Sequence, residues 1–342
     1  METNQPDRYI RQTIFAPLGR EGQEKLLAAR VVLIGCGANG TVIANTLARA
    51  GVGSLVIVDR DYVELNNLQR QVLFDEEDVA RGTPKAVAAA EKLRRVNSSI
   101  HIEGKVADVN SENIEELIEG ANLVLDGTDN FETRFLINDA CVKHDIAWIY
   151  AGAVASYGMT MTIVPHVTAC LRCVFPHEPP PGTLATCDTA GVLAPIVGVM
   201  GSLAGAEAIK YLAGAGTRNN GIIHVDVWEN SFESFSIARR ADCPTCGKGE
   251  YDYLEGERSG AATAYLCGRD AVQVNPGSGH AVSLPALAER LRPVGQVSVN
   301  EYLVKFTIDQ YELTIFPDAR AIVKGTDDAA VARTLYAKYV GI

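Results

Sequence analysis

Residues 30–61 read RVVLIGCGANGTVIANTLARAGVGSLVIVDRD, and this stretch decides the fold. It opens with a continuous apolar run at residues 31–34, which is typical of a strand buried on both faces. A glycine turn at residues 35–40 leads into a small-residue helix pattern, and a second apolar run stops at Asp59. Strand, glycine turn, helix and strand in this order predict an α/β fold with a Rossmann-like, doubly wound, mainly parallel sheet.

The glycine turn predicts a nucleotide site. Glycines let the backbone approach a phosphate, and a helix N-terminus offers free N–H groups and the positive end of the helix dipole. Asp59, at the tip of the second strand, is placed to bind ribose hydroxyls. The alternative is a close-packed turn that holds no ligand, and the turn alone does not identify the nucleotide.

Composition limits the class of protein. The chain has 342 residues, 47% of them hydrophobic and 21% charged, as expected for a globular protein with one large domain and a small one. Its net charge of −11 argues against a nucleic-acid partner and an anionic membrane surface. The N-terminus shows no apolar signal segment, and the longest uncharged run, residues 189–206, contains Pro195 and several glycines. We expect a cytoplasmic protein in which this run is a buried or subunit-interface helix.

Two Cys-x-x-Cys pairs lie far apart in the chain. Cys170 and Cys173 form the first pair, and Cys243 and Cys246 form the second. Four thiolates are the ligand set of a closed tetrahedral zinc site. The spacing predicts a zinc clasp that joins distant segments, rather than four unrelated thiols or a redox pair.

Polar and basic residues follow the second strand. The segment after Asp59 is rich in side chains that can bind phosphates, namely Asn66, Asn67, Gln69, Arg70 and Gln71. Lys85 opens an alanine-rich helix, where a cation is unfavourable for the helix dipole unless a phosphate lies nearby.

A further strand at residues 123–125 ends in Asp126-Gly-Thr-Asp-Asn130. Ligands of open α/β sheets bind at the carboxyl ends of parallel strands, so Asp129 is a candidate Mg²⁺ ligand. Asp129 is an equally good candidate for the N-cap of the next helix, as are Asp126 and Asn130.

Two other residues stay ambiguous from their patterns alone. Arg11 lies three residues from Arg8 on one face of a short predicted helix, which favours an ordinary solvated face. Cys187 lies in a polar stretch after a proline-rich segment, and it is either a nucleophile with a lowered pKa or a spectator thiol.

We predict three regions. Residues 1–248 form a nucleotide-binding domain with structural zinc, residues 249–258 a linker rich in Gly, Glu, Asp and Arg, and residues 259–342 a small α+β domain of unknown role.

Together these motifs resemble the ThiF/MoeB adenylyltransferases, which are relatives of ubiquitin-activating enzymes. The resemblance covers residues 8–247 and rests on the ordered combination of Arg8-Tyr-Ile-Arg11-Gln12, the glycine turn, Asp59, Asn67-Leu-Gln-Arg70-Gln71, Pro84-Lys85, Asp126-Gly-Thr-Asp129-Asn130 and the two cysteine pairs. It implies that ATP adenylates the C-terminal glycine of a ubiquitin-like sulfur carrier ending in Gly-Gly, after which sulfur attacks the acyl-adenylate.

The resemblance also implies roles for individual residues. The nucleotide would contact Gly35, Gly37, Ala38, Gly40, Asp59, Asp61, Asn67, Gln71 and Asn130. Arg70 and Lys85 would stabilise the phosphate charge, Asp129 would hold Mg²⁺, Arg11 would reach into the partner subunit of a homodimer, and Cys187 would match a cysteine that forms a covalent link in some members. The turn departs from the family pattern at Ala38 and Asn39, which puts its fine geometry in question.

Several alternatives stay open at this point. The same chemistry could act on another carboxylate, such as that of a peptide, or on a tRNA base. An NAD-dependent oxidoreductase would share the glycine turn but would not explain Arg70, Lys85, Asp129 and the cysteine pairs. A non-catalytic scaffold would not need the full set of charged residues. A sulfurtransferase or cysteine desulfurase is a further expected partner, whereas no nucleic-acid or membrane partner is expected.

Overall fold

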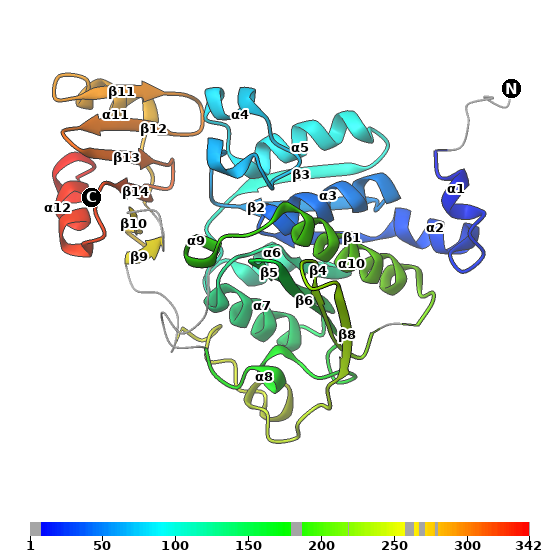
Figure 1. Cartoon of the computed structure of the whole chain (residues 1–342). Helices are drawn as coiled ribbons and strands as arrows, with labels where there is room; N and C mark the ends of the chain where they lie inside the picture. Colours follow the sequence, from blue (N-terminus) through cyan, green and yellow to red (C-terminus); the bar gives the residue numbers. More distant parts are fainter. Residues whose placement is uncertain are drawn as a thin grey trace, which may run out of the picture. The chain divides into compact units, whose positions relative to one another are not determined.

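The computed structural model describes residues 8–178, 187–217, 219–256, 263–266, 271–277 and 280–341. The chain divides into two compact units, one made of residues 1–79 and 84–259 and the other of residues 80–83 and 260–342. Each unit is described by itself below, and Figure 1 labels its elements.

The larger unit is built on an eight-stranded sheet with the order β3-β2-β1-β4-β5-β6-β7-β8. The first five strands are parallel to one another, and the last three are antiparallel. The strands are β1 (Arg30–Ile34), β2 (Ser54–Asp59), β3 (His101–Val106), β4 (Leu123–Asp126), β5 (Trp148–Val154), β6 (Tyr157–Ile163), β7 (Gly221–Asp226) and β8 (Ser231–Ser236). The predicted mainly parallel, doubly wound sheet is therefore confirmed.

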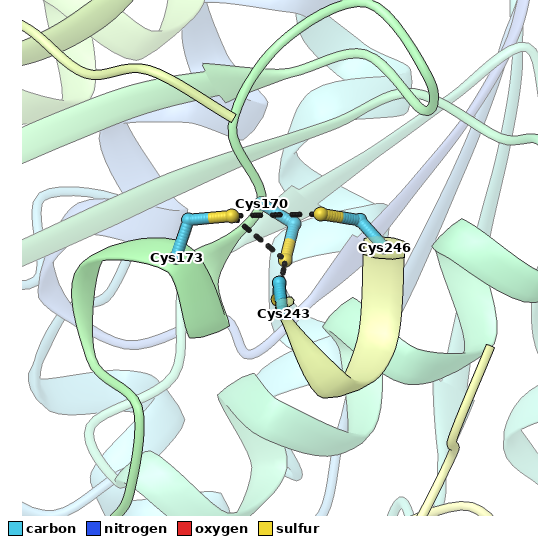
Figure 2. Close-up of side chains that lie close together, drawn as sticks. All are labelled: Cys170, Cys173, Cys243 and Cys246. Atoms are coloured by element: carbon cyan, nitrogen blue, oxygen red, sulfur yellow. Dashed lines mark hydrogen bonds between the residues drawn. The ribbon is translucent and has the colours of Figure 1, made fainter. Parts of the chain in front are cut away.

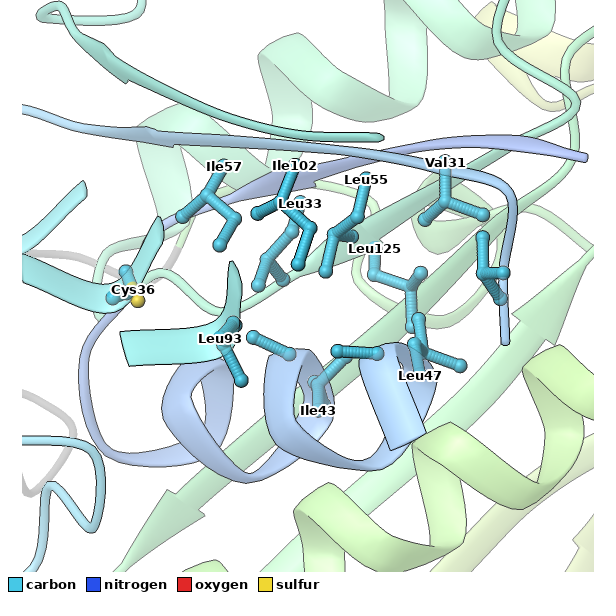
Figure 3. Close-up of a cluster of buried hydrophobic side chains, with 14 of the residues drawn as sticks. Val31, Leu33, Cys36, Ile43, Leu47, Leu55, Ile57, Leu93, Ile102 and Leu125 are labelled. Atoms are coloured by element: carbon cyan, nitrogen blue, oxygen red, sulfur yellow. The ribbon is translucent and has the colours of Figure 1, made fainter. Parts of the chain in front are cut away.

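Helices cover both faces of this sheet, as the continuous burial of β1, β2 and β4 requires. The helices of this unit are α1 (Ile10–Thr13), α2 (Gly19–Ala28), α3 (Ala38–Ala50), α4 (Glu76–Arg81, which ends at the unit boundary), α5 (Lys85–Val96), α6 (Ile114–Ile118), α7 (Phe131–Lys143), α8 (Leu171–Val174), α9 (Cys187–Ala190) and α10 (Ala194–Ala213). On one face, strand residues such as Leu33 and Ile57 pack against Leu47 of α3 and Leu93 of α5 (Figure 3). On the other face, Val32 and Val56 pack with Phe135 of α7.

The uncharged run forms α10, which packs inside this unit. By length and composition it is the one helix in the described residues that could cross a membrane, and half of its apolar window is buried within the unit. Gly201 and Gly205 let its backbone approach α3, since a Cβ atom on Gly201 would lie 2.6 Å from Cβ of Val42 and one on Gly205 would lie 2.8 Å from Cγ2 of Thr46. The two glycines therefore serve a helix–helix contact within one chain.

Part of the predicted linker is packed rather than extended. Tyr253 is only 2% exposed and stacks on Phe135 at a ring-centroid distance of 4.8 Å. Leu254 is also buried in the same cluster. The polar composition of residues 249–258 concealed these two apolar anchors. The linker and the domain boundaries stay predictions.

The smaller unit is an antiparallel sheet with helices packed against it, as predicted for a small α+β domain. Its strand order is β11-β12-β13-β14-β10-β9. The elements are β9 (Thr263–Leu266), β10 (Ala271–Val274), α11 (Leu284–Leu291), β11 (Gln296–Val299), β12 (Val304–Ile308), β13 (Tyr311–Ile315), β14 (Ala321–Lys324) and α12 (Ala329–Tyr339). Leu287 of α11 and Tyr336 of α12 share a core with Phe306 of β12.

The tight contact of α10 with α3 leads to a prediction for two glycines of the same helix. Gly201→Ala should lower the free energy of unfolding by about 1–3 kcal/mol, because the added methyl group overpacks the contact with Val42. Gly198→Ala is the matched control, since its Cβ atom meets nothing within 4 Å. It should be neutral or stabilise the protein by up to about 1 kcal/mol. Urea unfolding measures both, and equal effects of the two changes would contradict the packing described.

Candidate active site and metal centre

The glycine turn joins β1 to α3 by direct backbone contact. Gly35 has a φ of +87°, which favours glycine, and a Cβ atom on Gly40 would fall well inside 3.0 Å of the Gly35 carbonyl oxygen. Ala38 begins α3, and the Asn39 side chain donates to the carbonyl of Ala151 at 3.2 Å. The two departures from the family pattern are therefore accommodated in the turn.

Gly127 completes this contact, and sequence reasoning assigned it no role. It follows β4 directly, and its N–H donates to the carbonyl of Ile34 at 2.8 Å. A Cβ atom here would lie 2.9 Å from Cα of Gly40 and closer still to the carbonyl oxygen of Gly35. Its signal was present in the sequence as a glycine directly after a buried strand, where close backbone approach is common.

Asp59 connects the glycine turn to the segment after β2. Its Oδ2 accepts a hydrogen bond from the Cys36 N–H at 2.6 Å, and its Oδ1 accepts one from the Asp61 N–H at 2.7 Å. Burial raises the pKa of this carboxyl, while the neighbouring Lys85 ammonium opposes that shift. Asp59 is thus held at the carboxyl edge of the sheet, beside the start of α3.

Lys85 and Asp61 form a buried ion pair at the same edge. Lys85 Nζ lies 3.1 Å from Asp61 Oδ2, and the Lys85 N–H donates to the Asp61 carbonyl at 2.8 Å. Lys85 is only 3% exposed, so the pair is shielded from solvent. The sequence predicted a phosphate beside this cation, and the structure adds a carboxylate that offsets its position at a helix N-terminus.

Arg60 is a second cation here that sequence reasoning missed. Its Nη1 lies 2.9 Å from Asp108 Oδ1, and its Nε lies 4.0 Å from Asp61 Oδ1. Burial disfavours the charged form, but the carboxylates of Asp108, Asp61 and Asp129 outweigh burial and raise the pKa of Arg60. The candidate Mg²⁺ ligand Asp129 therefore lies within the electrostatic reach of this cluster. Alone in a sequence, an arginine after an acidic residue carries no signal that separates it from a surface residue.

The polar segment after Asp61 forms a 3₁₀ turn, Leu65–Asn67, whose side chains bond one another. The buried Asn67 accepts a hydrogen bond from the Glu64 N–H at 3.1 Å through its amide oxygen. Arg70 is half-buried, and its Nη1 donates to the Asn66 carbonyl at 2.9 Å. Gln71 is buried beside them. These contacts order the predicted phosphate-binding side chains before any ligand binds.

The loop after β4 distinguishes three polar residues that the sequence left equivalent. Asn130 is the N-cap of α7 and accepts from the Thr133 N–H at 2.8 Å. Asp126 is buried, lies 3.0 Å from Arg134 Nε and accepts from the Thr128 N–H. Asp129 is exposed. Of the three, Asp129 is therefore the side chain that faces solvent at the carboxyl edge of the sheet.

Arg11 is not brought to this cluster within its own subunit. Arg11 is exposed on α1, which is bonded to the C-terminal end of α3 through Gln12 and the carbonyl of Ala50. α3 has 13 residues, so about 20 Å separates this end from the glycine turn of the same chain. The backbone of Cys187 begins α9, but its side chain lies outside the described residues.

The four cysteines of the two Cys-x-x-Cys pairs, called knuckles below, form the one potential metal cluster found in the described residues. All four sulfurs lie within 4.8 Å of one another, and the thiol groups point toward a common centre (Figure 2). The Cys170–Cys243 and Cys173–Cys246 sulfur distances are 3.6 and 3.5 Å. A tetrahedron of sulfurs around zinc has edges of about 3.8 Å, so the predicted set fits a closed metal site.

Helix α7 links this cluster to the active-site loop. Near its C-terminal end, Asn138 accepts from the Leu171 N–H at 2.9 Å in the first knuckle, and Asp139 accepts from the Thr245 hydroxyl at 2.8 Å in the second. Asp139 also accepts from the Tyr253 N–H at 3.0 Å. Burial raises the pKa of Asp139 to about 6. The cysteine clasp therefore fixes the helix that starts beside Asp129.

A glycine turn that accommodates phosphates, buried cations and an exposed acid at one edge of a parallel sheet define a nucleotide-binding enzyme. The chain matches the ThiF family over residues 9–245, and it belongs to this family. This confirms the resemblance read from the motifs, and the chain is an adenylyltransferase of the ThiF/MoeB type.

The chain is similar to several known proteins, and a relative from Bacillus subtilis covers nearly its whole length. A sulfur carrier protein ThiS adenylyltransferase of Bacillus subtilis is 44% identical over 98% of this chain and 99% of its own length. A SAMP-activating enzyme E1 of Haloferax volcanii is 40% identical over 75% of this chain and 94% of its own. The crystal structure of Escherichia coli MccB with ATP has a TM-score of 0.63 and 26% identity, and the match covers 71% of this chain and 75% of that one.

Proposed function

We propose that this chain adenylates the C-terminal glycine of a small ubiquitin-like sulfur carrier that ends in Gly-Gly. The observation that carries the proposal is the likeness to the Bacillus subtilis ThiS adenylyltransferase, which extends over both units of the chain. The carrier carboxylate attacks the α-phosphorus of ATP, the bond from that phosphorus to the bridging oxygen breaks, and pyrophosphate leaves. The acyl-adenylate is then ready for attack by sulfur. We place this activity in the cytoplasm.

The site residues support this reaction through charge. The glycine turn and the N-terminus of α3 accept the phosphates, Asp59 takes the ribose, and Asp61, Asn67, Gln71 and Asn130 line the nucleotide. Arg70 and Lys85 offset the negative charge that builds up as pyrophosphate departs. Asp129 would hold Mg²⁺, which supplies further positive charge at the phosphates. The Lys85 ammonium would then interact with both the Asp61 carboxylate and the phosphates.

The sheet ends in a surface that suits a protein partner. β8 is an edge strand of the eight-stranded sheet, and its Phe232 and Phe235 side chains are exposed. Trp228, in the turn before β8, is 72% exposed. Exposed aromatic side chains beside an unpaired strand edge are typical of a surface that binds another β-sheet. This supports a folded carrier over a free amino acid as the substrate.

We further propose that the enzyme is a homodimer in which Arg11 acts in the partner's site. In its own subunit Arg11 lies at the far end of α3 from the glycine turn. Ile10, Ile14 and Phe15 around it are exposed, and Phe15 is 63% exposed. An apolar group around an arginine suits a subunit interface. In the later step the Cys187 thiolate would attack the acyl-adenylate, which forms a thioester with the carrier and releases AMP. Alternatively, a sulfurtransferase or cysteine desulfurase persulfide would pass its outer sulfur to Cys187 and leave as a thiolate, and the resulting Cys187 persulfide would attack the acyl-adenylate with release of AMP.

A peptide carboxylate, the alternative left open by the sequence, is the second candidate. The microcin C7 biosynthetic enzyme MccB, solved in complex with N-formylated MccA, shares this fold with 26% identity. Pyrophosphate–ATP exchange separates the candidates: we expect exchange with a Gly-Gly carrier and none with carrier truncated by two residues. Exchange with short peptides alone would favour the second candidate.

Lys85→Met and Asp129→Asn should each lower the exchange rate by a factor of about 100 or more, because both remove transition-state charge stabilisation.

Lys143→Met is the control for these changes, since Lys143 lies at the end of α7 remote from Asp129 and its side chain is 40% exposed. It should keep the exchange rate. If Lys85→Met keeps the wild-type rate of pyrophosphate–ATP exchange, Lys85 does not bind the phosphates.

Mixed dimers test the arginine in trans. Arg11→Ala and Asp129→Ala homodimers should both be inactive, and a mixture that exchanges subunits should regain activity, because the heterodimer contains one site with both residues intact. Failure of the mixture to regain activity, with subunit exchange shown by mass spectrometry, would place Arg11 in its own subunit's site.

We propose that the metal of the cysteine clasp is zinc. Elemental analysis should find about one zinc per chain, and Cys243→Ser or prolonged chelation should remove it and lower the Tm, because the clasp ties both knuckles to α7. Cys141→Ser is the control, since Cys141 is buried outside the clasp and should leave the zinc content unchanged. Full zinc content in Cys243→Ser would contradict the ligand set.

A further inference from the structure

The motif Arg8-Tyr-Ile-Arg-Gln12 has an inward-facing and an outward-facing part. Arg8, Tyr9 and Gln12 bind their own subunit, as detailed below, whereas Ile10 and Arg11 are exposed. The Arg11 side chain makes no hydrogen bond or ion pair with the described residues. α1 is a single turn of four residues, which has no stability of its own in water. Its orientation therefore depends on what its inward-facing side chains bind.

Tyr9 lies against the end of α3. Its ring occupies the space of a missing side chain at Gly51, where a Cβ atom would lie 2.5 Å from the ring. Its hydroxyl oxygen accepts from Asn97 Nδ2 at 2.9 Å, and the same Nδ2 donates to the carbonyl of Ala48 at 2.7 Å. Tyr9 is thus bonded to the residue that closes α5 and packed on the residue that closes α3.

Gln12 makes a second set of contacts one turn further along. Its Nε2 donates to Gln23 Oε1 at 2.7 Å and to the carbonyl of Ala50 at 3.0 Å. Gln23, which is buried in α2, donates to the same carbonyl at 2.9 Å. Arg8 Nη1 adds a hydrogen bond to the carbonyl of Val96 at 2.9 Å. Free carbonyls at the ends of α3 and α5 therefore hold α1 in place.

We propose that Tyr9, Gln12 and Gln23 are positioning residues for catalysis, and that they act by holding α1 so that Arg11 projects from its own subunit at a defined angle. The inference rests on the proposed function, in which Arg11 completes the site of a second copy. The same helix, α3, begins at the glycine turn of its own site and ends at this anchor. A rigid helix therefore sets the distance between a subunit's nucleotide loop and the arginine that it supplies to its partner.

The inference predicts that anchor variants behave like weak Arg11 variants. Gln12→Ala and Gln23→Ala should each lower kcat of pyrophosphate exchange about tenfold, because a misplaced arginine loses transition-state contacts, while KM for ATP stays within about twofold. Gln23→Ala is informative because it changes α2 and leaves α1 intact. Thr13→Ala is the matched control, since among the described residues its hydroxyl bonds only the carbonyl of Ile10 within α1, and it should keep the wild-type kcat.

Two further measurements separate positioning from loss of folding. Mixing Gln12→Ala subunits with Asp129→Ala subunits should raise activity several-fold, because the second chain supplies a correctly held α1 to the intact site of the first. Hydrogen exchange at residues 9–13 should be faster in Gln12→Ala and Gln23→Ala than in Thr13→Ala, whatever the substrate.

The outcomes are distinct. The inference would be overturned if the wild type is active and hydrogen exchange at residues 9–13 is faster in the anchor variants, but mixing Gln12→Ala with Asp129→Ala subunits gives no gain in activity. A wild-type kcat in both Gln12→Ala and Gln23→Ala would also overturn it. If the wild type adenylates no carrier, the proposed function fails, and hydrogen exchange alone then decides whether Gln12 and Gln23 hold α1.

Discussion

The structure depends on a backbone contact between three glycines at the carboxyl edge of the sheet. Gly35, Gly40 and Gly127 follow β1, begin α3 and follow β4, and a side chain at Gly40 or Gly127 would overlap the neighbouring backbone. This contact brings the start of α3, Asp59 and the Asp129 loop to one place. The helix N-terminus can then face a phosphate while residues from three strands surround it. The proposed roles of Asp59 and Asp129 follow from this closeness.

Charge is balanced around that contact before a ligand binds. Lys85 pairs with Asp61, Arg60 with Asp108 and Arg134 with Asp126, all at least partly buried. Such pairs hold cations near the phosphate site without leaving an uncompensated buried charge. The cysteine clasp holds the second half of α7 through hydrogen bonds to Asn138 and Asp139. The helix that begins beside Asp129 is therefore also held by the clasp.

Local patterns were sufficient for the elements of the larger unit. The apolar runs 31–34, 55–58 and 123–125 all became strands, because a strand buried on both faces needs uninterrupted apolar residues. The four clasp cysteines lie together, as the matching spacing of the two Cys-x-x-Cys pairs predicted. Roles that depend on distant neighbours were missed. Gly127 and Arg60 act through residues far away in the chain, and Tyr253 packs on Phe135 from a segment whose composition is polar.

The sequence by itself determined the parallel strands, the glycine turn, the cysteine cluster and the family, because each is encoded by residue types at short spacing. Tertiary structure decided which acid faces solvent in the Asp126–Asn130 loop, which carboxylate balances Lys85, and where Arg11 lies. These three outcomes depend on the order of the strands in the sheet and on the length of α3. The strand order brings together residues that are far apart in the chain, and α3 separates Arg11 from the glycine turn. The pattern around Arg11 predicts a solvated residue, and the structure places this exposed residue at the end of α3 opposite the glycine turn.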